Sequence, residues 1–132
     1  MIGIDTNIVI RYLVQDDPEQ SAIACRIFEE EVSSTNKGHI CPIVLCEVIW
    51  VLLRSYKQTK EKIITVIRTL LLASNIEIQH SDSAWKALKD YESGTADFSD
   101  YLIAHINKEC GASFTLTFDR AAAKSRLIKL AQ

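Results

Sequence analysis

Apolar and polar residues alternate along the chain with two periodicities, one typical of short strands and one typical of helices. Residues 1–4 are largely apolar and lead into the polar triplet Asp5-Thr6-Asn7, after which residues 8–14 form an apolar run long enough to begin a helix. Between residues 59 and 74, apolar side chains recur at the three- and four-residue intervals of one helix face. Residues 76–78 alternate singly, as a strand does. The pattern therefore predicts alternating strands and helices.

Several of these elements carry residues that commonly begin or stop a helix. Asp17 suits an N-cap, Pro18 suits the first helical position, and Gln20 stands where a capping box requires it. Gly94 is a typical stop for the helix before it, on which we expect Trp85 and Leu88 to lie inside. The other expected elements are a strand over residues 38–41, helices over 42–53, 81–93 and 97–110, a strand over 113–119, a short helix over 121–124 and an edge strand over 127–130.

In order, the elements are a strand followed by two helices, three times over, and then a strand, a short helix and a final candidate strand. Alternation of this kind predicts an α/β fold with a mainly parallel central sheet of four or five strands and helices on both faces. The length of 132 residues suits a single domain spanning residues 1–132, large enough for a substantial core.

Composition narrows the class of protein without identifying its activity. No run reaches the roughly 18 apolar residues of a membrane helix, and no signal peptide is evident, so we expect a cytoplasmic protein without a membrane segment. The four cysteines form no CxxC pair, which favours reduced thiols over a structural zinc site. The formal net charge of −2 is unusual for a nucleic-acid-binding protein, but acids gathered at one site would leave the remaining surface more basic.

Two aspartates directly follow predicted strands. In a parallel α/β sheet, ligands bind beyond the carboxyl ends of the strands, and Asp5 and Asp119 both occupy that position. Each also suits the N-cap of the segment that follows, so capping alone accounts for either residue taken singly. Further carboxylates at the same place would instead favour a functional site.

Glu47 is the unusual acid, because it lies within the apolar stretch over residues 42–53. A helix of that composition should be buried on most sides, and an unpaired carboxylate there is costly unless a cation or a proton compensates it. A salt bridge to Arg11 or Arg54 is one explanation. A bound metal ion is another.

Asp97 and Asp100 stand at the start of the helix expected from residue 97. Because they are three residues apart, they are neighbours on its first turn. Asp97 as N-cap and Asp100 at the third helical position both suit a helix N-terminus. Two acids on one turn also repel each other, so a cation between them would be stabilising.

Together, the acids form a set of oxygen ligands without imidazole or thiolate, which favours Mg²⁺ or Mn²⁺ over Zn²⁺. Hard divalent ions in such sites commonly activate water and hold a phosphate during in-line displacement. Capping explains each aspartate singly but does not explain Glu47. A shared metal site therefore accounts for the set better.

The order of these motifs resembles that of PIN-domain ribonucleases. The motifs are Asp5-Thr6-Asn7, Glu47 in an apolar helix, Asp97-Phe98-Ser99-Asp100 before Leu102-Ile103-Ala104, and Thr117-Phe118-Asp119. The opening is especially similar to VapC-type toxins of bacterial and archaeal toxin–antitoxin pairs, through Arg11-Tyr12-Leu13 and Asp16-Asp17-Pro18-Glu19-Gln20. Each motif is weak alone, whereas four in this order are specific, and the resemblance covers essentially the whole chain.

The resemblance implies a divalent-metal-dependent endoribonuclease that hydrolyses RNA phosphodiester bonds with Mg²⁺ or Mn²⁺. The family's catalytic acids correspond by position to Asp5, Glu47, Asp100 and Asp119. The implied metal ligands are Asp5, Asp97, Asp100 and Asp119, and the polar residues beside the metal are Thr6, Asn7 and Thr117. The resemblance also implies a homodimer, and a small antitoxin whose C-terminal segment covers the acidic site.

Two other functions fit parts of the pattern. A metal-dependent phosphatase on an α/β sheet often carries a second Asp two residues after the first, and here that position is Asn7. A non-catalytic PIN-like module for RNA binding or scaffolding would be expected to lack some of the acids, and all of them are present. The residues therefore favour the ribonuclease.

Overall fold

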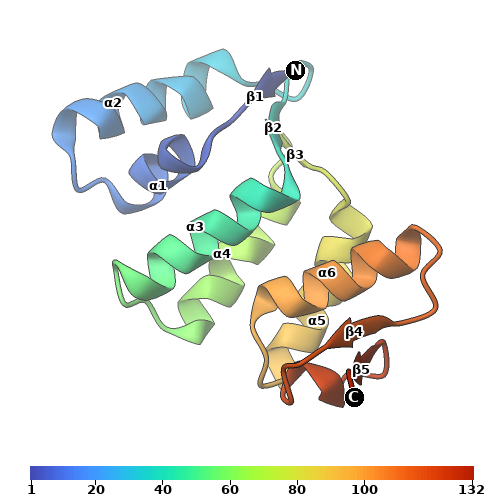
Figure 1. The fold of residues 1–132 in the computed structure, drawn as a ribbon. Coiled ribbons are helices and arrows are strands. Elements are labelled where there is room, and N and C mark those ends of the chain that lie inside the picture. Colours follow the sequence, from blue (N-terminus) through green and yellow to red (C-terminus); the bar gives the residue numbers. More distant parts are fainter. The chain divides into compact units, whose positions relative to one another are not determined.

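Strands and helices alternate along the chain in the order that the hydrophobic pattern predicts. The computed structural model describes all of residues 1–132, which divide into two units, residues 1–79 and residues 80–132 (Figure 1). The first unit contains β1 (Ile2–Gly3), α1 (Thr6–Val14), α2 (Pro18–Arg26), the π-helical turn η1 (Ile27–Glu31), β2 (Gly38–Ile40), α3 (Pro42–Arg54), α4 (Lys60–Leu72) and β3 (Ile76–Ile78). The second contains α5 (Ser81–Ser93), α6 (Phe98–Glu109), β4 (Thr115–Thr117), the 3₁₀ turn η2 (Ala122–Lys124) and β5 (Ile128–Leu130).

The first unit is built on a three-stranded parallel sheet in the order β1-β2-β3. Gly38 of β2 lies opposite Ile2 on one side and Ile76 on the other. Helix α1 packs against α2 and α3, and α4 packs against α3 and β3. The apolar stripes of these elements are buried, and the fully buried side chains include Val9, Ile10, Ile40, Leu45, Leu52, Ile63 and Ile67.

The second unit pairs two helices with a two-stranded sheet. Helices α5 and α6 pack against each other, and the parallel strands β4 and β5 are joined through η2, with Thr115 opposite Ile128 (Figure 1). The core is apolar, and its most deeply buried members are Ala84, Ala87, Leu88, Phe98, Leu102, Ala104 and Ala122. The predicted α/β class and the parallel pairing are thereby confirmed, with the hydrogen-bonded strands arranged as ladders of three and two.

Helix ends follow the capping residues, with one correction. Asp17 accepts a hydrogen bond from the Gln20 backbone N–H at 3.0 Å, and Pro18 is the first helical residue, as predicted. The Gln20 side chain does not close the capping box, because its Oε1 instead accepts from Nε of Arg11 at 2.7 Å. Gly94 follows the last residue of α5, as predicted.

Two expectations about burial were wrong. Helix α3 was expected to be buried on most sides, but Ile43 is 70% exposed and Trp50 is 40% exposed, so one apolar face of this helix is uncovered. Trp85, expected inside, is 37% exposed, whereas Leu88 on the same helix is buried. Apolar composition therefore overstates burial in both units.

All four cysteines are free, and burial raises the pKa of the Cys46 thiol to about 11, so that it stays protonated at neutral pH. No helix has both the length and the apolar character needed to cross a bilayer.

Candidate functional site

Asp5 lies where the first strand gives way to the first helix. It is the N-cap of α1, and its Oδ1 accepts a hydrogen bond from the Thr6 backbone N–H at 2.8 Å. The residue is otherwise exposed, and its second carboxylate oxygen has no hydrogen-bond partner. Capping therefore uses one oxygen of Asp5 and leaves the other available to a ligand.

Glu47 is held next to the start of α1 by a neutral donor. The buried hydroxyl of Thr6 donates to Oε1 of Glu47 at 3.2 Å, across the packed helices α1 and α3. Glu47 is exposed, which corrects the expectation of a buried carboxylate. The residue lies on the uncovered face of α3, so solvent compensates its charge.

Neither arginine proposed as a salt-bridge partner of Glu47 plays that part. Arg11 pairs with Asp16, at 3.2 Å between Nη1 and Oδ1, and the guanidinium of Arg54 lies 6.0 Å from the ring centre of Trp50. Asn7, the third residue of the first motif, is exposed and lines a groove with Ile8 and Arg11. The hydrogen bond from Thr6 is therefore what orients Glu47.

In the second unit, three acids surround the start of α6. Asp97 is the N-cap of this helix, and Asp100 accepts a hydrogen bond from the Asp97 backbone N–H at 3.3 Å. Asp119 follows β4, where its Oδ1 accepts from the Ala122 backbone N–H at 2.9 Å. Thr117 accepts from the Asp119 backbone N–H at 3.0 Å and thus supports the main chain beside the carboxylate.

Burial and neighbouring charge act together on Asp100. Partial burial is the main cause that raises the pKa of this carboxyl, the negative charge of Asp119 raises it further, and the Asp97 charge adds to it. The hydrogen bond from the Asp97 backbone opposes these effects. Asp100 also lines a small pocket with Thr115, Leu116 and other residues of β4, η2 and β5. The acids of this unit thus lie close enough to repel one another.

Each unit brings together its own share of the predicted residues. Residues 1–79 join Asp5, Thr6 and Glu47, and residues 80–132 join Asp97, Asp100, Thr117 and Asp119. No group of three or more Asp, Glu, His or Cys side chains is spaced to hold a metal ion. The donors themselves suit a hard divalent cation, because all are oxygens and the acids carry unneutralised negative charge.

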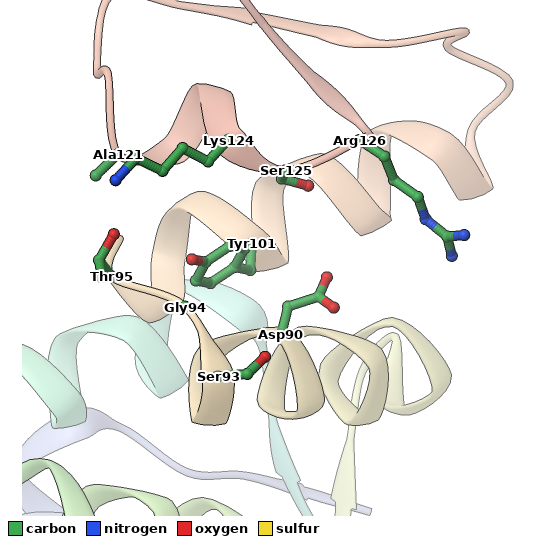
Figure 2. A pocket seen from close by; sticks show the side chains of 9 residues that line it. All are labelled: Asp90, Ser93, Gly94, Thr95, Tyr101, Ala121, Lys124, Ser125 and Arg126. Carbon is green, nitrogen blue, oxygen red and sulfur yellow. The ribbon is translucent and has the colours of Figure 1, made fainter.

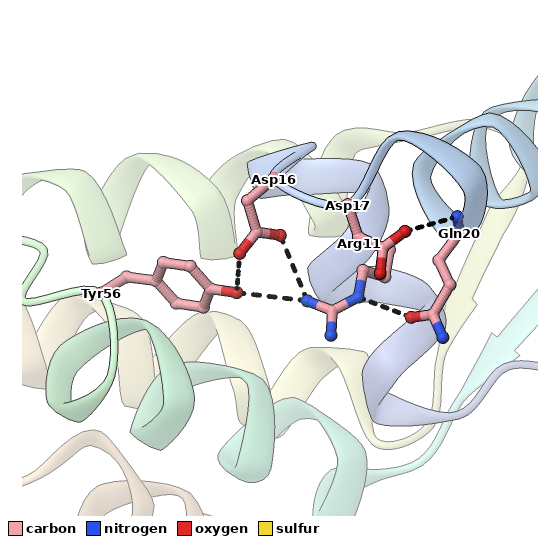
Figure 3. A network of polar contacts seen from close by, with 5 residues as sticks. All are labelled: Arg11, Asp16, Asp17, Gln20 and Tyr56. Atoms are coloured by element: carbon pink, nitrogen blue, oxygen red, sulfur yellow. Dashed lines mark hydrogen bonds and ion pairs between the residues drawn. The ribbon is translucent and has the colours of Figure 1, made fainter.

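A polar network that the sequence did not predict anchors the helix that follows Asp5. The Tyr56 hydroxyl donates to Oδ2 of Asp16 at 2.7 Å, and Arg11 reaches Asp16, Tyr56 and Gln20 (Figure 3). The Tyr56 hydrogen bond is the main cause that lowers the pKa of Asp16, and the same bond raises the pKa of Tyr56. The network ties α1 to α2 and to the turn after α3, and no sequence spacing reveals it.

A second pocket in residues 80–132 was also missed. It is lined by two cations, hydroxyl groups and a glycine from α5, the loop before α6, and η2 with the residues after it (Figure 2). Lys124 and Arg126 are its cations, and they belong to no charge pattern that the sequence would make visible.

Comparison with known proteins places most of the chain within one family model. The family model described as PIN domain matches residues 2–126, and so spans both units. No curated protein matches the chain significantly.

Proposed function

The chain belongs to the PIN domain family, whose members are generally nucleases, and from this premise we propose that it is an endoribonuclease dependent on Mg²⁺ or Mn²⁺. Its reaction would be the hydrolysis of phosphodiester bonds within RNA. The observation that carries the proposal is the placement of acids directly after strands β1 and β4, each with only one oxygen engaged in capping. Such positions are where α/β proteins bind ligands.

In this proposal the catalytic acids are Asp5, Glu47, Asp100 and Asp119, and the metal ligands are Asp5, Asp97, Asp100 and Asp119. A divalent ion bound by these oxygens would activate water and neutralise the phosphate. The chain's own residues set the geometry: the Thr6 hydroxyl orients Glu47, and the backbone N–H groups of Thr6 and Ala122 fix Asp5 and Asp119. Thr117 holds the main chain at Asp119, and Asn7 lies exposed beside Thr6.

We further propose that the protein is a VapC-type toxin that forms a homodimer and is inhibited by a small cognate antitoxin. Support comes from a groove on α1 and α2 that is lined by Asn7, Ile8, Arg11, Gln20 and Ile23, with Ile23 40% exposed. A partner helix with apolar anchors suits such a groove, and a basic side chain on it would suit the acids. Addition of the antitoxin encoded next to this chain should stop RNA cleavage, and a tightly bound neighbour that leaves cleavage intact would contradict the toxin assignment.

The deciding experiment is incubation of the antitoxin-free protein with total RNA and with Mg²⁺, Mn²⁺ or EDTA. We expect internal cleavage with either metal and none with EDTA, because the proposed acids need a cation to approach a phosphate. Asp119→Asn should remove the activity, whereas Glu30→Gln, an exposed acid on η1, should leave it unchanged. RNA binding without cleavage under every condition would instead identify a non-catalytic RNA-binding or scaffold module.

A further inference from the structure

The second unit contains a pocket that the proposed chemistry does not use. It has a volume of about 420 Å³ and lies between the end of α5, the loop before α6, and η2 with the residues that follow it. Its lining residues are Asp90, Ser93, Gly94, Thr95, Tyr101, Ala121, Lys124, Ser125 and Arg126 (Figure 2). Most of these residues carry a polar group, and hydroxyl groups lie on several sides.

The pocket is lined by two cations and a single acid, so its charge is positive on balance. Lys124 and Arg126 are exposed, and neither side chain has a hydrogen bond or an ion pair. The pocket's one acid, Asp90, is already engaged, because its Oδ2 lies 2.7 Å from Nε2 of His105. Two cations therefore face the pocket with no carboxylate bound to either, which favours an anionic ligand.

The shape of the pocket is fixed by Tyr101. Its hydroxyl accepts a hydrogen bond from the Ala96 backbone N–H at 3.2 Å, which holds the loop over residues 94–96 against α6. Gly94 lies so near this hydroxyl that a Cβ at that position would overlap it. The wall formed by the loop is therefore preorganised, and a ligand would not have to order it.

The pocket adjoins the acids of the same unit. Tyr101 directly follows Asp100, and Ala121 comes two residues after Asp119. Ala122 lines the small pocket that contains Asp100, while its neighbour Ala121 lines the cationic one, so η2 separates the two. A ligand long enough to extend over both pockets would contact acids in the small pocket and cations in the other.

Binding of RNA, a polyanion, to this chain requires a local group of cations. The formal net charge of −2 supplies no general attraction for RNA, and the acids repel phosphates. In Figure 2 the side chains of Lys124 and Arg126 extend toward opposite ends of the pocket, a spread that suits successive phosphates of one strand better than a single small anion. The hydroxyls of Ser93, Thr95 and Ser125 add donors for phosphate and ribose oxygens.

We propose that this pocket binds the sugar–phosphate backbone of the RNA strand beside the phosphate that is cleaved, with Lys124 and Arg126 each contacting one phosphate. The proposal rests on the proposed ribonuclease function and adds to it the way the strand is held. It also explains how a chain with a negative net charge binds RNA. Because no base is read, the contribution to binding is independent of sequence.

The test measures binding of a short single-stranded RNA to the full chain in EDTA, where cleavage does not interfere. The double variant Lys124→Ala/Arg126→Ala should raise Kd roughly tenfold at low salt. It should also make the dependence of log K on log salt shallower by about 0.7 for each lost phosphate contact. The matched control, Lys89→Ala/Lys108→Ala, removes two exposed cations of the same unit outside the pocket and should bind like wild type.

A modified RNA separates a specific contact from general electrostatics. Neutral methylphosphonate linkages at the two positions next to the cleaved bond should weaken binding to wild type by a similar factor and leave binding to the double variant unchanged. The conservative variant Lys124→Arg should retain most of the affinity. Equal losses in the double variant and the control, or competition by inorganic phosphate at concentrations as low as RNA, would overturn the proposal.

The two proposals fail in different ways. If wild type and the double variant bind equally and the protein still cleaves RNA with Mg²⁺, the pocket assignment is wrong and the nuclease assignment stands. If the double variant binds more weakly but no metal supports cleavage by wild type, the cationic pocket stands as an RNA site and the nuclease assignment is wrong. If the chain neither binds RNA in EDTA nor cleaves it with Mg²⁺ or Mn²⁺, both are wrong.

Discussion

The acids of the two units are accommodated in opposite ways. Asp5 and Glu47 are exposed, and each accepts a hydrogen bond from Thr6, through its backbone N–H or its hydroxyl. Asp100 is partly buried, and burial together with the charges of Asp119 and Asp97 raises its pKa. Each acid of the first pair therefore has one hydrogen bond and is otherwise solvated, whereas the second group carries repulsion that a cation would relieve.

The largest expected effect concerns catalysis by the first pair. Glu47→Gln keeps an acceptor for the Thr6 hydroxyl but loses the charge, so it should lower the rate of RNA cleavage at least about a hundredfold. Thr6→Val keeps the charge and loses only the orienting hydrogen bond, so its loss should be smaller, roughly tenfold. Single-turnover rates with Mg²⁺ measure both. Equal losses would show that orientation matters as much as charge.

The second effect is on stability and distinguishes the units. Asp100→Asn removes a charge from the repelling group while keeping an acceptor for the Asp97 backbone N–H, so it should raise the melting temperature of the metal-free protein by a few degrees at neutral pH. Asp5→Asn should change it little, because Asn caps a helix about as well as Asp. Thermal unfolding in EDTA gives both melting temperatures. A larger increase for Asp5→Asn than for Asp100→Asn would contradict the proposed difference between the units.

The pH dependence of this gain has a definite sign. The folded pKa of Asp100 lies above the usual value of 3.8, so the native state binds more protons than the unfolded state between the two values. The stability that Asp100 provides is complete below the unfolded pKa and is lost as pH rises through the folded one. The advantage of Asp100→Asn should therefore vanish in acid and be complete at neutral pH, and an advantage that stays constant would assign the effect to packing.

Metal addition should produce a smaller shift in melting temperature, which depends on the proposed ligands. At a Mg²⁺ concentration about ten times its Kd, a bound ion stabilises the folded state by about 1.4 kcal/mol. Asp100→Asn should lose most of this increase in melting temperature, because it removes a proposed ligand and the charge that favours the ion. Glu30→Gln should retain it. The comparison is made by thermal unfolding with Mg²⁺ at fixed ionic strength.

The smallest expected effect lies in the Arg11 network of the first unit. Tyr56→Phe removes the hydrogen bond that lowers the pKa of Asp16, so it should reduce the melting temperature slightly. A lowered carboxyl pKa stabilises the folded state in full above the unfolded value and not at all below the folded one, so the difference from wild type should shrink as pH falls through the folded pKa of Asp16. A difference that grows in acid would contradict the assigned cause.

The sequence predicted the order of elements because each depends on local information. Helix α5 spans residues 81–93 and ends before Gly94, as predicted, and the Asp17 side chain caps α2. Gln20 shows where such reasoning fails, since a capping box and a contact with Arg11 compete for the same side chain and only packing selects between them. Element type was thus predictable, but the choice between partners was not.

The same limit applies to the candidate site. Asp5, Asp97 and Asp119 were recognisable because strand ends and helix starts fix their place along the chain. The exposure of Glu47 was not, because it depends on which face of α3 its neighbours cover. The cationic pocket could not be predicted, because it forms only where the fold brings Lys124 and Arg126 together with Ser93 and Thr95. These two residues lie some thirty positions earlier in the sequence.

The close approach of Gly94 to the Tyr101 hydroxyl has a consequence for how this sequence tolerates change. Any side chain at position 94 would displace Tyr101, and with it the loop over residues 94–96. Gly3 and Gly111 have open space around them, although the positive φ of Gly111 favours Asn among replacements. In a library covering every position, residue 94 should therefore admit glycine alone, residue 111 a narrow set and residue 3 many substitutions.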